Sequence, residues 1–169
     1  MKKITTKQLT FMALLTAIAL AIHVAEAQIP APVPIPGVKL GLANIVTVYA
    51  VFTLGAGPAL MILVARILLG SLFAGQVMSL AYSLAGGLLC FVVMLLLKKV
   101  LTRQQIWVAS VIGAIFHNIG QILVAIVVTG TPAIVSYLPV LLLSGIAAGL
   151  FTGFAAQTFI SRMDKRDMK

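Results

Sequence analysis

The sequence predicts an all-α integral membrane protein, a bundle of six transmembrane helices, and two observations lead to that prediction. Of its 169 residues, 62% are hydrophobic and only 9% are charged, and the mean hydropathy is +1.17. A soluble domain of this length needs far more polar surface. The apolar residues also fall into runs of roughly 20, the length that a helix needs to cross a bilayer. We therefore expect a single membrane domain over residues 1–169.

The expected spans cover residues 9–29, 39–54, 57–74, 77–97, 105–129 and 134–160, and a basic tail follows over 161–169. Basic residues cluster in three places, which are the N-terminus, the loop after the fourth span and the tail. Six spans put all three clusters on one side, and basic loops favour the cytoplasmic side. The sequence therefore predicts a multi-pass protein of the cell membrane with both termini in the cytoplasm.

The N-terminus has an alternative interpretation. Lysines, an apolar run and then Ala25-Glu26-Ala27 imitate a secretory signal with its cleavage site. The run is long for such a signal, and its removal would leave five spans with the termini on opposite sides. We therefore expect the first helix to be retained.

Several classes of function are excluded by composition and motifs. The net charge of +9 suggests nucleic acid, but the basic residues form no patch interleaved with aromatic residues, so we expect no nucleic-acid partner. The single cysteine, Cys90, and two histidines give no metal-ligand pattern, so no metal or other cofactor is expected. Walker A, dinucleotide-binding and nucleophile motifs are also missing. We expect no catalytic residues, and hence a protein that is not an enzyme.

A proline-rich connector separates the first two spans. It holds four of the seven prolines, at positions 30, 32, 34 and 36, and proline fixes φ and lacks an N–H group. The connector is therefore expected to be extended and stiff, as the lid or rim of a pocket that opens outward. Glu26 precedes it, and Lys39 and Asn44 follow it. Polar groups so close to lipid-spanning segments are costly, which makes these three candidates for binding.

Arg66 lies near the middle of the third span, where a guanidinium costs at least ~2.5 kcal/mol to insert. It either pairs with Glu26, a structural role, or holds an anion. The two roles can coexist if Glu26 occupies Arg66 until a ligand arrives. In the fifth span, His117, Asn118 and Gln121 share one arc of about 100° and form a network, a ligand site or both.

These charges together predict a binding site. Lys39 and Arg66 carry two positive charges against the single negative charge of Glu26, which leaves one positive charge unmatched. The expected ligand is therefore a small molecule that is anionic or amphipathic. The candidate substrate-binding residues are Glu26, Lys39, Asn44, Arg66, His117, Asn118 and Gln121.

A second surface is predicted on the first helix. Ala13, Ala17 and Ala21 recur every four residues, on a face nearly opposite to His23 and Glu26. A smooth face of this kind allows another helix to approach closely. The alternative is that the alanines pack inside this chain's own bundle.

The run PIPGVKLGLAN, with Glu26 before it, Arg66, and HNIGQ followed by YLP resembles the Gx transporter family. Its members are often labelled heptaprenyl diphosphate synthase component I, and the family is similar to the S components of energy-coupling factor transporters. The resemblance implies docking through the three alanines onto a transmembrane coupling subunit with two cytoplasmic ATPases. It carries the family's residues over to Glu26, Gly37, Lys39, Asn44, Arg66, His117, Asn118 and Gln121.

Two functions from different classes follow. The first is a substrate-binding subunit for uptake of a small anionic or amphipathic metabolite, in the lipid bilayer and energised by a separate ATPase module. The alternative is a non-catalytic membrane accessory of heptaprenyl diphosphate or menaquinone biosynthesis. Prenyl chain elongation needs Mg²⁺ held between a diphosphate and clustered carboxylates. The chain has three acidic residues, two of them in the tail, so catalysis by this chain alone is not expected.

Overall fold

The computed structural model of the protein describes residues 5–29, 39–74 and 77–167. In these ranges it contains six α-helices and no strand, which confirms the predicted all-α class. The helices are α1 (Thr6–Glu26), α2 (Asn44–Thr53), α3 (Ala56–Ala74), α4 (Val77–Leu97), α5 (Ile106–Thr129) and α6 (Leu138–Asp167), with two short 3-10 helices, η1 (Arg103–Gln105) and η2 (Pro132–Tyr137).

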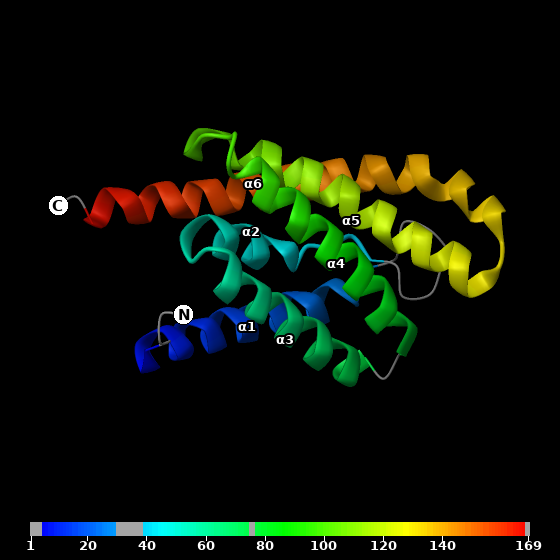
Figure 1. Ribbon diagram of the computed structural model, residues 1–169, viewed down its shortest axis with the longest axis horizontal. Helices are drawn as coiled ribbons and strands as arrows, with labels where there is room; N and C mark the ends of the chain where they lie inside the picture. Colours follow the sequence, from blue (N-terminus) through cyan, green and yellow to red (C-terminus); the bar gives the residue numbers. More distant parts are fainter. Residues whose placement is uncertain (1–4, 30–38, 75–76, 168–169) are drawn as a thin grey trace.

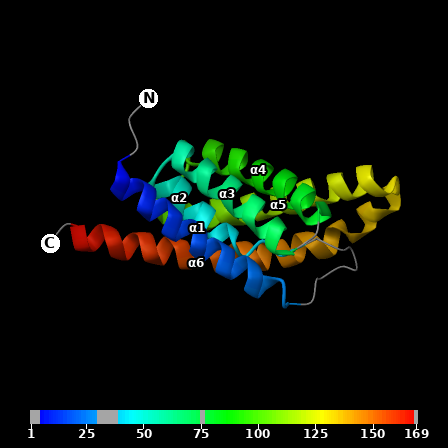
Figure 2. The same cartoon turned by 90° about the horizontal axis from the view of Figure 1, so that it is seen from below.

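The helices lie side by side and run in alternating directions along one bundle (Figure 1). The start of α1 and the end of α6 lie at the same end of the bundle, as a view turned by 90° also shows (Figure 2). Helix α5 packs against both α4 and α6, while α1 packs against α3. Helix α2 is central, because it contacts α1, α3, α4, α5 and α6.

Within the part of the chain that the structure describes, five helical segments are long and apolar enough to cross a membrane, at Thr6–Glu26, Ala56–Phe73, Met78–Leu97, Arg103–Thr129 and Pro132–Met163. The protein is therefore a multi-pass membrane protein. Helix α2 is the exception, because its 10 residues reach only about 15 Å, half of a hydrocarbon core of about 30 Å.

The predicted second helix, over 39–54, is wrong at its start, because α2 begins five residues later, at Asn44. Gly41 adopts φ +82°, in the left-handed region, and a residue in this conformation interrupts a right-handed helix. The sixth helix also differs from its prediction. Residues 132–137 form η2, and α6 then continues through the basic tail to Asp167.

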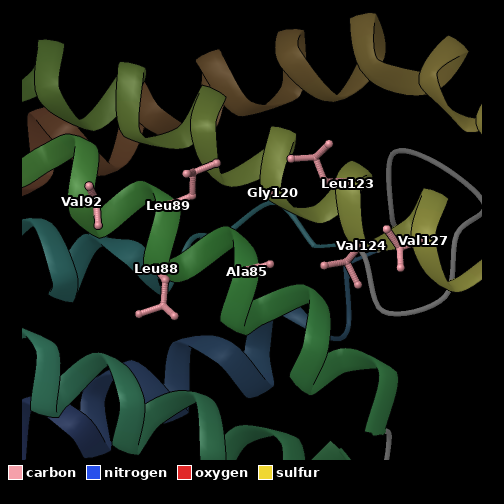
Figure 3. A pocket seen from close by; sticks show the side chains of 8 residues that line it. All are labelled: Ala85, Leu88, Leu89, Val92, Gly120, Leu123, Val124 and Val127. Carbon is pink, nitrogen blue, oxygen red and sulfur yellow. The ribbon is translucent and has the colours of Figure 1, made fainter.

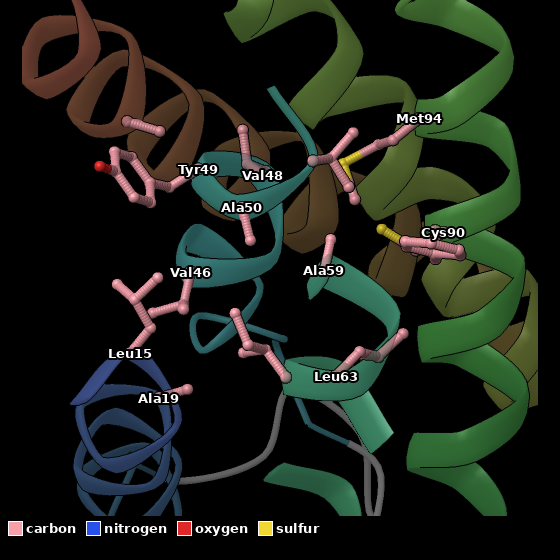
Figure 4. Close-up of a cluster of buried hydrophobic side chains, with 14 of the residues drawn as sticks. Leu15, Ala19, Val46, Val48, Tyr49, Ala50, Ala59, Leu63, Cys90 and Met94 are labelled. Atoms are coloured by element: carbon pink, nitrogen blue, oxygen red, sulfur yellow. The ribbon is translucent and has the colours of Figure 1, made fainter. Parts of the chain in front are cut away.

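The core of the bundle surrounds α2, where seven of the 10 residues are buried. Figure 4 shows Val46 of α2 beside Leu15 of α1, with Ala59 and Leu63 of α3 between α2 and the helix that carries Cys90 and Met94. Lipid tails are as apolar as these side chains, so the hydrophobic effect does not drive helices together in a bilayer. They associate instead through close van der Waals packing. A short central helix closed in by five others therefore holds its first residue, Asn44, inside the bundle.

Glycines allow α5 and α6 to approach each other closely. A Cβ added to Gly149 would lie 2.8 Å from Cα of Val111, and one added to Gly153 would lie 2.7 Å from Cα of Trp107. Distances this short leave no room for a methyl group. Gly149 and Gly153 of α6 thus serve close packing against α5.

We expect Gly149→Ala to lower the melting temperature of the detergent-purified protein. The added methyl group must push backbone away from backbone, which costs about 1–3 kcal/mol for an overpacked site. Gly57→Ala in α3 is the matched control, because its Cβ meets nothing within 4 Å. There alanine's better helix propensity should preserve or raise the melting temperature. Equal melting temperatures for the two variants would contradict the packing assignment.

Candidate functional site

The candidate site is built around the turn that leads into α2. The amide of Gly41 donates a hydrogen bond to Oε1 of Glu26 at 2.5 Å, and the amide of Ala43 faces the same carboxylate. Glu26 is the last residue of α1 and is only 4% exposed. The carboxylate therefore ties the end of α1 to the start of α2, where the helix dipole favours negative charge.

Arg66 projects from α3 to the first residue of α2. Its Nη2 donates to Oδ1 of Asn44 at 3.2 Å, and the side chain is 4% exposed. Its Nε has no acceptor among the described residues. The described residues show no direct salt bridge between Arg66 and Glu26, whose carboxylate accepts a hydrogen bond from Gly41. Anion binding by Arg66 stays a prediction.

Lys39 and His23 form a second contact beside this turn. Nζ of Lys39 lies 3.0 Å from Nε2 of His23. An ammonium only donates, so Nε2 accepts and the neutral imidazole carries its proton on Nδ1.

Helix α5 brings two further candidates to the turn. A Cβ on Gly41 would lie 3.2 Å from Cδ2 of His117, so this imidazole packs directly against the turn. Nε2 of His117 lies 3.1 Å from Nε2 of Gln121, and both side chains are buried. Oε1 of Gln121 has no hydrogen-bond partner among the described residues.

Asn118 is directed differently. Its Nδ2 donates to the carbonyl oxygen of Leu141 in α6, and a Cβ on Gly145 would collide with the same Nδ2. Its contacts therefore lie on the α6 side of α5, although its Oδ1 remains without a partner among the described residues. Of the other six candidates, Glu26, Asn44 and His117 lie against Gly41, Arg66 and Gln121 are linked to them through Asn44 and His117, and Lys39 contacts His23.

Two residues of this cluster were missing from the predicted site. His23 lies three residues before Glu26 on the same helical face, a spacing that places it beside the site. Only one feature of the sequence pointed to Gly41 as part of the site, which is that a glycine lies just before a short helix. The four prolines of the connector, which was predicted as a lid or rim, and Gly37, which the family resemblance carried over, lie outside the described residues.

Chemically, the cluster offers more positive than negative charge. Lys39 and Arg66 face the single carboxylate of Glu26, and all three influence one another electrostatically. A buried polar atom without a hydrogen bond costs about 1–3 kcal/mol, so the open positions on Arg66 and Gln121 suit a bound polar group. Within the described part of the chain, no three His, Cys, Asp or Glu side chains gather as a metal site requires.

Comparison with known families confirms the resemblance to heptaprenyl diphosphate synthase component I. Residues 15–159 match the profile of heptaprenyl diphosphate synthase component I. The chain belongs to the heptaprenyl diphosphate synthase component I family. All seven candidate binding residues of this family member lie within the matched range. No curated protein and no solved structure matches the chain at a significant level.

Two apolar grooves of this component I family member lie outside the polar cluster. One, of about 460 Å³, lies between α4 and α5, and no candidate site residue lines it (Figure 3). The other, of about 490 Å³, lies between α1, α2 and α6, with Leu15, Ile18 and Ile22 on its α1 wall. Since residues four apart share a helix face, Ile22 of this wall lies one turn before Glu26 on the same face of α1.

The alanines of α1 lie on the outside of the bundle of this family member. Ala13, Ala17 and Ala21 are all exposed, whereas His23 and Glu26 are buried. Ala13 and Ala17 line a shallow groove of about 380 Å³ between α1 and α3. These alanines are thus not packed inside the described part of the chain's own bundle.

Proposed function

We propose that the protein is a membrane-embedded substrate-binding subunit, similar to an S component, that takes up a small anionic or amphipathic metabolite. The observation that supports this is Arg66, which is buried inside the bundle and hydrogen-bonded to a neutral amide rather than to a carboxylate. Burying a charge without a partner is expensive. A ligand anion would compensate it, and the open Nε of Arg66 would donate to that anion.

In this proposal the remaining residues have distinct roles. Arg66 holds the anion, Gln121 supplies a hydrogen bond, and Asn44 and His117 shape the site beside Gly41. Asn118 contributes through its open Oδ1, since its Nδ2 is engaged with α6. Glu26 and Lys39 control the rim. The groove along α1 ends one turn from Glu26, which gives space for the apolar part of an amphipathic ligand.

We also propose a single membrane domain with six crossings and cytoplasmic termini. The start of α1 and the end of α6 share one end of the bundle (Figures 1 and 2). Residues 39–53 would form the remaining crossing, with α2 as one half and the segment before it as the other. Non-helical backbone is tolerated at membrane depth where protein buries it, and Ala43 in this segment is fully buried.

Energy would come from a separate module, a transmembrane coupling subunit with cytoplasmic ATPases. The exposed alanine face of α1 supports this, because small residues let a partner helix approach closely. Whole-bundle reorientation against the coupling subunit would then expose the site to either side, which requires different ligand affinities in the two states.

Ala17→Leu should prevent association with the coupling subunit without changing ligand retention. The larger side chain would hold a partner helix away from α1. The control is Ala147→Leu, which places the same side chain on an equally exposed alanine of α6. Both variants are compared by affinity purification from cells that express the coupling module. Normal complex formation by Ala17→Leu would rule out docking through this face.

A second function is favoured by the family name. As a non-catalytic accessory of heptaprenyl diphosphate or menaquinone biosynthesis, the protein would present a lipidic substrate or anchor a soluble synthase. Its polar cluster and adjoining groove suit a molecule with an anionic head and an apolar chain. Co-purification separates the two functions, because an ATPase module supports uptake and a soluble prenyltransferase supports the accessory role.

Native mass spectrometry of the detergent-purified protein tests the shared premise that the cluster binds an anion. We expect a small anionic molecule to remain bound to the wild-type protein and to dissociate at higher collision energy. Its mass would identify the substrate class. The proposed function would be contradicted if the wild-type protein carries only detergent and lipid and also binds no anionic metabolite from a membrane-free extract.

A further inference from the structure

We infer that the N-terminal end of α2 is an anion-binding site, and that the Glu26 carboxylate occupies it as a tethered substitute for the ligand's own acidic group. The inference rests on the proposed function and deepens it. It assigns the ligand a carboxylate or phosphate group, and it assigns Glu26 the role of a competitor rather than a ligand contact.

The first observation is how α2 begins. This helix of 10 residues starts inside the bundle, and its N-cap residue, Ala43, provides no side-chain cap. The Gly41 amide just before it points at a carboxylate oxygen of Glu26. A helix that begins within a membrane protein directs its positive N-terminal end toward negative groups. The carboxylate already in place shows that this end accepts an acidic group.

The second observation is independent of the helix end. Arg66 comes from α3, is 4% exposed and bonds to Asn44, the first residue of α2. Its Nε has no acceptor among the described residues. A buried cation with an open donor and a helix N-terminus thus meet at one point, and both favour an anion there. Glu26 accepts the hydrogen bond of the Gly41 amide before the helix, but it forms no salt bridge with Arg66.

The position of Glu26 explains why it is displaceable. It is the last residue of α1, where the negative end of the helix dipole disfavours a carboxylate. Residues 27–29 after it are exposed, so the side chain has space to move outward. A ligand acid that replaces it would face both Lys39 and Arg66 without the opposing charge. Release of Glu26 would also untie α1 from the turn before α2, which links binding to a movement at the rim.

Isothermal titration calorimetry on the full-length protein in detergent tests this, with sodium phosphate and sodium acetate as probes at constant ionic strength. Removal of a competitor that fills the site nine-tenths of the time raises affinity tenfold. We therefore expect Glu26→Ala to bind one of the two anions about tenfold more tightly than the wild type. The preferred probe tells phosphate from carboxylate. Equal or weaker binding of both anions would overturn the inference.

Glu26→Gln keeps the shape and removes the charge, so it serves as the test if the alanine variant does not fold. Its affinity should exceed that of the wild type, and adding Arg66→Gln should remove the gain. In the wild type, saturating anion should increase deuterium uptake over residues 22–29, because Glu26 is released. Unchanged uptake counts against the inference. If Arg66 proves necessary for retaining the native ligand while both Glu26 variants bind no better, this inference fails and the proposed function stands.

Discussion

Arg66→Gln abolishes retention of the anionic ligand and leaves the bundle folded. This outcome is expected because the guanidinium is the buried cation of the site, and removing one partner of a buried charged contact costs about 2–5 kcal/mol, at least 30-fold in affinity. The fold loses little, since among the described residues Arg66 is hydrogen-bonded to Asn44 alone, and its burial is itself unfavourable. The measurement is the ligand-bound fraction in native mass spectra, with the melting temperature recorded for the same preparation.

The control for this prediction is Arg162→Gln, which removes the same charge from an exposed position near the end of α6. It should retain the ligand as the wild type does. The opposite pattern for Arg66→Gln, a fall in melting temperature with unchanged ligand retention, would show that Arg66 supports the structure and does not bind the ligand.

Gly41→Ala should also eliminate ligand binding, through the shape of the turn rather than through charge. A non-glycine residue at φ +82° pays about 1–2 kcal/mol of strain. In addition, the new Cβ would lie 2.9 Å from Nδ2 of Asn44 and 3.2 Å from Cδ2 of His117. The turn must therefore move, which displaces the amide that binds Glu26 and the side chain that binds Arg66.

Gly55→Ala isolates the contribution of backbone strain, since Gly55 has φ +90° and its Cβ meets nothing within 4 Å. Both variants should lose stability in thermal unfolding, but only Gly41→Ala should lose the ligand in native mass spectra. Loss of ligand in both would point to general destabilisation, and retention in both would show that the turn does not shape the site.

Most of the polar residues of the site could be predicted from the sequence, because polar residues are rare in apolar segments. A bilayer makes a buried Arg66, Glu26 or Gln121 costly, so their presence alone suggests that they meet inside the bundle. His23 and Gly41 were missed for a different reason. A glycine carries no chemistry, and only the coordinates show that its amide holds Glu26 and that its missing Cβ admits His117.

The division of α1 into two faces was equally predictable, because helical periodicity separates Ala17 from His23 and Glu26 wherever the helix is placed. The direction of Asn118 was not. Helical spacing puts it on one arc with His117 and Gln121, but side chains within such an arc still differ in the neighbour they meet. The close approach of α6 gives Asn118 the carbonyl of Leu141 as its partner.

The sequence by itself determined that this is an all-helical membrane protein with an excess of positive charge in its interior, because transfer into lipid selects strongly on composition and length. The tertiary structure alone decided that α2 is half a span long and that Glu26 caps its start instead of pairing with Arg66. Those outcomes depend on which donors reach a given acceptor across four different helices. Such distances are set by packing, and no local pattern of residues encodes them.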